Sequence, residues 1–234
     1  QMSAVAGVVP FDIAFRGQQV KVYTQLLRKA RELGYVLEDV VGDGDDGDGI
    51  AFQGAHVVAP KVGFYTSSVV TLDFASLYPS IMRTWNLSPD TLLKPLAAPV
   101  SEHPASAVAA NTPHRFVSAT VRRGLLPLIL DELLAERKKV RAQMKSLAPA
   151  SLEHSLLNCR QLALKVSANS CYGFTGCRRG TMTCIEVAES TTGIGRHIIE
   201  RTATALEAEW PGASVIYGDT DSCFVQLPNG TPTD

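Results

Sequence analysis

The sequence has little of what marks a membrane or secreted protein. Its 234 residues contain no apolar run near the ~18 residues that span a bilayer, and no signal peptide is recognisable. The five cysteines form no CxxC pair and have no histidine partner at zinc spacing. An odd number of cysteines without a secretory signal predicts reduced thiols in an intracellular protein. We interpret all five as small packing residues: Cys159, Cys171, Cys177, Cys184 and Cys223.

The sequence also lacks a large charge of either sign, since its formal net charge is -1. This sum argues weakly against a dedicated nucleic-acid-binding protein, but the charges are unevenly distributed. Residues 114–147 carry eight Lys and Arg against three Asp and Glu, whereas residues 38–50 carry six acids and no base. The acidic run 42–49 resembles a calcium loop only superficially, because the aspartate spacing fails and no closing glutamate follows. We assign it no metal role.

Hydrophobic residues make up 45% of the chain, which predicts a globular protein with one core or one core and a lobe. The periodicity predicts helices over 18–34, 124–147, 152–168 and 186–210, and a short helix around Pro79. It also predicts a buried strand over 69–74 and a final hairpin of 213–217 and 223–227. The segment 56–65 should be extended, and 88–115 should be irregular. We therefore expect an α/β (α+β) fold in which two helices form a projecting hairpin with a basic face.

Two carboxylates in the final hairpin, Asp219 and Asp221, would lie at its tip. An isolated Asp-x-Asp is most simply a solvated turn, because Asp is a common turn former. Asp73, however, ends the strand predicted over 69–74. If that strand pairs beside the hairpin, three carboxylates converge, and oxygen ligands of this kind suit two Mg²⁺ ions that act on a phosphoryl group.

Cations on the predicted helical hairpin could complement such a site. Arg137 and Arg141 are four residues apart on one helix, and Lys165 and Asn169 are four apart on the next. Arg can bind phosphate oxygens with two parallel hydrogen bonds, whereas Lys acts as a point charge. The alternative for the arginines is an ordinary solvated helix face, as most runs of charge are.

Three segments resemble the polymerase motifs of the B-family DNA polymerases, in the family's order. They are DFASLYPSIM (73–82), KVSANSCYGFTG (165–176) and YGDTDS (217–222). Flanking stretches at 16–30, 121–143 and 195–202 are similar to the eukaryotic replicative branch, close to delta-type enzymes of cells and large DNA viruses. The resemblance is weak only at 88–112 and in the acidic loop.

The resemblance implies roles for individual residues. Two Mg²⁺ ions, with Mn²⁺ as the alternative, would be held by Asp73, Asp221 and the carbonyl of Phe74, with Asp219 in a supporting place. The incoming dNTP would meet Ser76, Leu77, Tyr78, Arg137, Arg141, Lys165 and Asn169. Tyr78 would exclude a 2′-hydroxyl, and Lys165 would protonate the leaving pyrophosphate; the alternative for Tyr78 is a core aromatic. Tyr172 and Gly173 would lie beside the nascent base pair.

The resemblance further implies a right-hand polymerase fold, with an antiparallel palm sheet backed by helices and a helical-hairpin fingers lobe. Its palm would comprise 1–120 and 177–234, and its fingers 121–176. Since the chain starts at Gln1 and shows no exonuclease motifs, thumb or cysteine-rich module, we expect a fragment of a longer protein with little or no processive activity alone.

The implied function is replicative DNA-directed DNA synthesis on primer–template DNA, in the nucleus or a viral replication compartment. A sliding clamp and accessory subunits would bind parts of the protein outside this sequence, and no membrane is involved. Two alternatives remain open: a catalytically inactive polymerase-like scaffold that binds nucleic acid, and another metal-dependent phosphotransferase such as a nuclease or an RNA-making polymerase.

Overall fold

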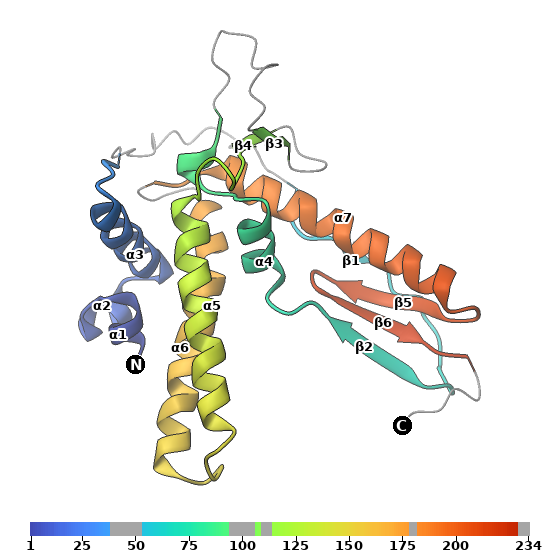
Figure 1. Cartoon of the computed structure of the whole chain (residues 1–234). Coiled ribbons are helices and arrows are strands. Elements are labelled where there is room, and N and C mark those ends of the chain that lie inside the picture. The colour runs from blue at the N-terminus through green and yellow to red at the C-terminus, as the bar shows by residue number, and fades with distance from the viewer. Residues whose placement is uncertain (38–52, 94–105, 109–113, 178–181, 229–234) are drawn as a thin grey trace.

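The computed structural model describes residues 1–37, 53–93, 106–108, 114–177 and 182–228. They form a mixed arrangement of helices and antiparallel sheet, in which a helical hairpin points away from the main sheet (Figure 1). The acidic run 42–49 lies outside the described residues, so its lack of a metal role stays a prediction. Within the described ranges, no helix has the length and apolar character needed to cross a membrane.

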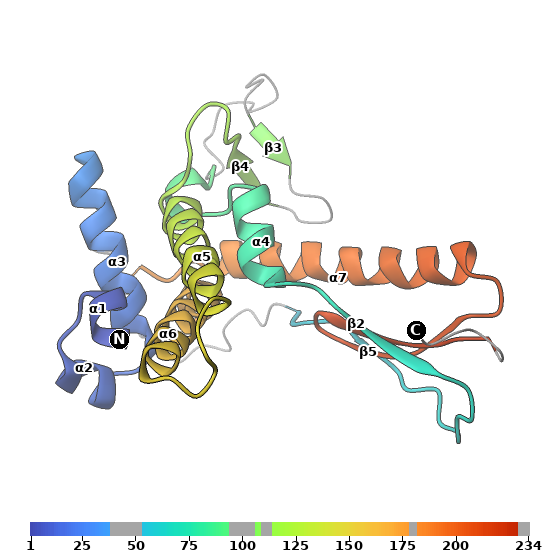
Figure 2. The same cartoon turned by 60° about the horizontal axis from the view of Figure 1, so that its bottom comes forward.

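The main sheet is built around the C-terminal hairpin that the sequence predicts. Its four strands, in spatial order, are β1 (Val57–Val58), β5 (Ser214–Asp219), β6 (Ser222–Gln226) and β2 (Val69–Asp73). All neighbouring strands pair antiparallel. Helix α7 (Ile185–Glu209) runs along one face of this sheet (Figure 2) and buries Ile199 against Val215, Cys223 and Val225. The predicted strand and hairpin are therefore confirmed, and they pair in the arrangement that brings Asp73 to the hairpin tip.

The prediction that the strand over 69–74 is buried is wrong. All five residues of β2 are exposed, and Val69, Val70 and Leu72 keep 39%, 37% and 43% of their accessible surface. The physical reason is the position of β2 at the edge of the sheet, where it has a partner on one side only. A continuous β-branched run is typical of a strand covered on both faces, and that pattern cannot reveal an edge position.

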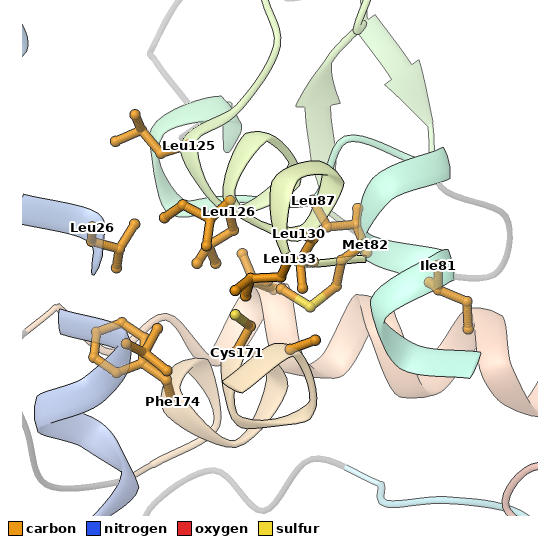
Figure 3. Packing of buried hydrophobic residues seen from close by; sticks show 14 of the residues in the cluster. Leu26, Ile81, Met82, Leu87, Leu125, Leu126, Leu130, Leu133, Cys171 and Phe174 are labelled. Atoms are coloured by element: carbon orange, nitrogen blue, oxygen red, sulfur yellow. The ribbon is translucent and has the colours of Figure 1, made fainter. Parts of the chain in front are cut away.

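The projecting hairpin consists of α5 (Leu125–Met144) and α6 (Leu152–Thr175), packed side by side (Figure 1). Leu126, Leu130 and Leu133 of α5 meet Cys171 and Phe174 of α6 in the hydrophobic core (Figure 3). The sequence predicts α6 only to residue 168, but the helix continues to Thr175. Consequently the whole segment 165–175 lies on one continuous helix.

Three helices precede the sheet: α1 (Met2–Ala6), α2 (Pro10–Phe15) and α3 (Gln18–Leu33). The last is confirmed, with Gly34 at φ 70° as the residue that ends it. Helices α1 and α2 were not expected, because five or six residues carry too little periodicity to be recognised. Helix α3 packs against α5 and α6 and adds Val22, Leu26 and Ala30 to the same core.

The five cysteines are unpaired, as expected, and Cys171, Cys184 and Cys223 are buried. Burial raises the pKa of the Cys171 and Cys184 thiols to about 12, which keeps them protonated and unreactive. Cys159 is exposed on α6, so its interpretation as a packing residue is wrong.

A buried junction joins the projecting hairpin to the end of helix α4 (Leu77–Thr84), beside the 3₁₀ turn η1 (Pro89–Thr91). Asn86, 1% exposed and at φ 56°, donates to the carbonyls of Val117 and Arg122 at 2.8 and 2.9 Å and accepts from the Gly124 N–H at 2.9 Å. Side chains of Ser88 and Asp90 then accept from the next two N–H groups of α5, at 3.2 and 3.1 Å. The N-terminus of α5 is thus capped by side chains from a segment more than 30 residues earlier in the chain. The remaining described strands, β3 (Ser106–Val108) and β4 (Arg115–Val117), pair with each other nearby.

We expect Asn86→Ala to destabilise the chain by about 3 kcal/mol, because three buried hydrogen bonds are lost and their partners stay unpaired. Urea unfolding gives the free energy of unfolding. The control is Asn158→Ala, since among the residues that the structure describes the Asn158 side chain accepts a single hydrogen bond, from Gln161 on the same helix. Equal effects of the two substitutions would contradict a structural role for the junction.

Candidate active site

The three aspartates predicted to converge are gathered at one end of the main sheet. Asp73 is the last residue of β2 and pairs in register with Ser222, the first residue of β6. Asp219 ends β5, and Asp221 lies in the turn between β5 and β6. The N–H of Phe74 donates to the carbonyl of Asp221 at 2.8 Å, which fixes the end of β2 to this turn.

The turn itself has a constrained backbone. Thr220 has φ 55°, in the left-handed region that is uncommon for a residue with a branched side chain. Its N–H donates to the carbonyl of His56 at 3.0 Å, and its hydroxyl donates to the Asp219 carboxylate at 2.8 Å. The segment before β1 therefore supports the turn from outside. Part of the hydrogen-bonding capacity of Asp219 is already used within the turn, so the two hairpin carboxylates are unequal.

The electrostatics of the cluster centre on Asp221. Burial, followed by the negative charges of Asp73 and Asp219, raises the pKa of the Asp221 carboxyl, while Lys165 acts in the opposite direction. Within the described part of the chain, Lys165 on α6 is thus the residue of the helical hairpin whose charge acts on Asp221. Mutually repelling carboxylates of this kind favour a bound cation. Nevertheless, no described group of three or more His, Cys, Asp or Glu side chains is arranged closely enough to count as a ready-made metal site.

Helix α4 begins directly after Phe74 and Ala75. Ser76, at φ 55° and ψ 55°, is its N-terminal capping residue, and Leu77 is its first helical residue. The first N–H groups of a helix have no partner within it, so they can donate to an anion. The start of α4 thus lies next to the carboxylates in sequence and offers donors of the kind that bind phosphate.

Two aromatic rings meet beside this position. Tyr78 of α4 and Tyr172 of α6 have ring centroids 4.4 Å apart and an interplanar angle of 41°. Burial, then Tyr172 and Asp221, raise the pKa of Tyr78 to about 12, while Arg196 opposes the shift. Burial also raises the pKa of Tyr172, again against Arg196. Both phenols are therefore neutral near pH 7, and Tyr78 lies within electrostatic reach of the carboxylates.

The two helices of the projecting hairpin carry the other predicted residues. Lys165, Asn169 and Gly173 are exposed along α6, and a Cβ built on Gly173 would meet no atom within 4 Å, so the space beside it is open. On α5, the Arg137 Nε donates to Gln161 of α6 at 3.3 Å. Burial and the neighbouring charge of Arg141 lower the pKa of Arg137, as expected for adjacent cations without an anion between them.

Arg196 on α7 is a site residue that sequence reasoning did not single out. Its guanidinium donates to the carbonyls of Gln53 and Gly54 at 2.6 and 2.7 Å, and its charge acts on both tyrosines. The sequence offered no distinct signal for it, since Arg196 is followed by His197 and Glu200 and resembles an ordinary polar helix position.

A separate cavity of about 250 Å³ lies between α1, α3, α5 and α6, away from the carboxylates. Its charged walls are largely self-paired, for example Lys29 with Glu132 at 2.6 Å and Arg160 with Glu136 at 2.8 Å. The candidate site is instead the open surface where the end of the sheet faces the hairpin. Such an open site suits an extended substrate better than an enclosed small molecule.

Comparison with known proteins agrees with the resemblance seen in the motifs. The family model for DNA polymerase family B matches residues 10–233. The DNA polymerase delta catalytic subunit of Oryza sativa subsp. japonica is 43% identical over 100% of this chain, which covers 22% of that protein. The subunit of the same name from Mesocricetus auratus is 44% identical over 97% of this chain, which covers 21% of that protein. The chain thus spans about a fifth of the length of these relatives.

A solved structure gives the same result for the fold. The family B DNA polymerase from the hyperthermophilic archaeon Pyrobaculum calidifontis superimposes with a TM-score of 0.75 at 38% sequence identity, over 97% of this chain and 28% of that one. The expected similarity to delta-type enzymes is confirmed by the curated relatives. Because the family model matches residues 10–233 and the fold superimposes on that of a family member, this chain belongs to DNA polymerase family B.

Proposed function

We propose that the chain carries the polymerase active site of a replicative DNA-directed DNA polymerase. The observation on which this mainly rests is the approach of Asp73 and Asp221 at the end of the sheet, with the charge of Lys165 on α6 acting on Asp221. The primer 3′-hydroxyl oxygen would attack the α-phosphorus of a dNTP. The bond between the α-phosphorus and the oxygen that links it to the β-phosphorus would break, and pyrophosphate would leave.

Asp73 and Asp221, with the carbonyl of Phe74, would hold two Mg²⁺ ions, and Asp219 would support them. The chemistry of the donors fits, since they are all oxygens and since the charges of Asp73 and Asp219 add to burial in raising the pKa of Asp221. When bound, the ions would supply charge stabilisation for the transferred phosphoryl group. Mn²⁺ prefers similar oxygen ligands and is the expected substitute.

The remaining residues would orient the nucleotide. The N–H groups of Ser76 and Leu77 would donate to the triphosphate, and Arg137 and Arg141 would neutralise its charge from α5. Lys165 would donate a proton to the leaving pyrophosphate.

The sugar and base would meet a second group of residues. Tyr78 would pack against the sugar and exclude a 2′-hydroxyl. Asn169, Tyr172 and Gly173 would line the nascent base pair, where the open space beside Gly173 lets the pair approach the backbone.

In this proposal residues 1–120 and 177–234 form the palm and 121–176 the fingers. Primer–template DNA and dNTP are the substrates, and a sliding clamp and accessory subunits would bind elsewhere on the full-length protein. The nucleus or a viral replication compartment is the corresponding location. Because the duplex would be gripped by parts outside this sequence, residues 1–234 alone should show little processive synthesis.

Lys165→Ala in the full-length protein should lower kcat/KM for dNTP incorporation about 10²-fold, because a cation beside the leaving group is lost. Single-nucleotide primer extension measures this loss. The matched control is Lys138→Ala: Lys138 is exposed on α5 and has no assigned role, so its removal should change the rate less than about twofold. Full activity of Lys165→Ala would contradict the proposal, and no extension by the unmodified protein would favour an inactive scaffold.

A further inference from the structure

We infer that Gly195, on helix α7, sets the position of the Tyr78 ring and is thereby a determinant of sugar selectivity. This inference rests on the proposed function, because it extends the role of Tyr78. Gly195 belongs to a helix that packs under α4, far along the chain from the segment 73–82. It would act through Tyr78 and would not itself touch the nucleotide, so it is a positioning residue.

The contact between the two residues is close. Gly195 is buried, and a Cβ built on it would lie 3.3 Å from Cε1 of Tyr78. The same built Cβ would lie 3.6 Å from the nearest side-chain atom of Ile81 and 3.8 Å from that of Leu77, which are ordinary van der Waals distances. Any side chain at position 195 would therefore press on the Tyr78 ring before it pressed on the rest of α4.

Glycine is otherwise a poor choice at this position. Gly195 is in the interior of a 25-residue helix, with no positive φ that would require glycine. Alanine is the most favourable helix residue and glycine among the least favourable. A tight approach of Tyr78 supplies a physical reason for glycine here, since only a residue without Cβ lets the ring lie against the helix backbone.

The direction of the expected displacement follows from burial. Tyr78 is half-buried and Gly195 is buried, and the centroids of the Tyr78 and Tyr172 rings lie 4.4 Å apart. A methyl group at 195 would press on the inner side of the ring, so the ring would move outward by a few tenths of an ångström. Outward is the side on which the nucleotide sugar would pack. The shifted ring should hinder a dNTP moderately and a 2′-hydroxyl more strongly.

A double-mutant cycle in the full-length protein tests this directly. Four proteins are compared: unmodified, Gly195→Ala, Tyr78→Ala and the double variant. Single-turnover incorporation of dNTP and of NTP gives kcat/KM for each sugar. Gly195→Ala alone should lower the dNTP value about tenfold and the NTP value by more. In the Tyr78→Ala background, where no ring remains to be displaced, the same substitution should change both values less than about twofold.

Thr204→Ala is the matched control, because it also raises helix propensity in α7 but is exposed and distant in sequence from position 195. It should leave the dNTP to NTP ratio unchanged. An effect of Gly195→Ala that persists undiminished without the Tyr78 ring overturns the inference. The inference is also overturned if Gly195→Ala lowers the melting temperature and the double variant with Tyr78→Ala shows the same loss. If Tyr78→Ala itself keeps its sugar selectivity, the proposed role of Tyr78 fails, while the cycle still reports whether Gly195 acts through the ring.

Discussion

Replacing Asp221 with asparagine in the full-length protein is expected to lower primer extension by about 10³-fold or more, because one of the charged oxygen ligands that we propose for the metal ions is lost. The backbone should stay in place, since the Phe74 N–H donates to the main-chain carbonyl of Asp221 and the substitution keeps that group. The loss should therefore appear in kcat at saturating dNTP. Pre-steady-state incorporation with Mg²⁺ measures it.

Asp219→Asn is the matched control within the same turn. The Asp219 carboxylate already accepts from the Thr220 hydroxyl at 2.8 Å, so it is less available to a metal ion. We expect a loss of about tenfold, much smaller than that of Asp221→Asn, and a similar loss for both variants would contradict their unequal roles.

Asp221→Asn, which should lower activity, should raise the stability of the fold at neutral pH. The pKa of Asp221 is raised by burial and by Asp73, so the folded state disfavours its charged form. The protonated form is the one that the fold favours, and this stabilisation is lost as the pH rises through the folded pKa. In chelator at pH 7, Asp221→Asn should therefore have a higher urea midpoint than the unmodified chain, and the difference should shrink as the pH falls toward 3. A lower midpoint would contradict the charge repulsion.

The site was predictable from sequence to the extent that it depends on local patterns. Asp219 and Asp221 are placed by a hairpin whose two apolar runs are plain in the sequence, and Asp73 by the end of a β-branched run. Their convergence needed only the pairing of β2 beside β6. Residues on α6 were placed by helical spacing, although the helix proved longer than its periodicity indicated.

What could not be predicted depends on contacts between distant segments. Nothing local in the sequence indicates that Asn86 caps α5, that the His56 carbonyl receives the Thr220 N–H, or that Gly195 lies under Tyr78. Each involves a main-chain atom or a missing Cβ, and side-chain periodicity does not report either one. The exposure of β2 could not be predicted for a related reason: it depends on the edge position of β2, and strand order is a property of the whole sheet.

A second group of hydrogen bonds, beside the buried junction, joins the helical hairpin to α4. Asp131 of α5 accepts from Arg83 of α4 at 2.5 Å and from Arg123 at 2.7 and 3.1 Å, and Arg123 donates to the Arg83 carbonyl at 2.7 Å. Helix α4 carries Tyr78, while α5 carries Arg137 and Arg141. The hydrogen-bonded pair α4 and α5 therefore keeps Tyr78 and the two arginines in a fixed relation, which the roles proposed for them in positioning a nucleotide would require.

Removing the Tyr78 ring is the second substitution with a large expected effect. Tyr78→Ala in the full-length protein should reduce the preference for dNTP over NTP by about 10²-fold, because the 2′-hydroxyl would no longer meet an aromatic ring. The change should come mainly from a higher kcat/KM for NTP, with a smaller loss for dNTP. Competitive single-nucleotide incorporation on one primer–template gives the ratio directly.

Tyr78→Phe is the matched control, since it keeps the ring and removes only the hydroxyl, whose pKa is raised to about 12. Because that group is neutral at pH 7 in any case, its removal should alter sugar preference less than about threefold. A strong effect of Tyr78→Phe would mean that the hydroxyl, and not the ring, excludes the ribose. Unchanged preference in Tyr78→Ala would instead make Tyr78 a core aromatic, and an unmodified protein that favours NTP would identify an RNA-making enzyme. Exclusion of the 2′-hydroxyl by the ring is the expected outcome: Tyr78 packs against Tyr172 and lies 3.3 Å from the position of a Cβ built on Gly195, and a ring held by its neighbours can exclude a hydroxyl group that a freely rotating ring would admit.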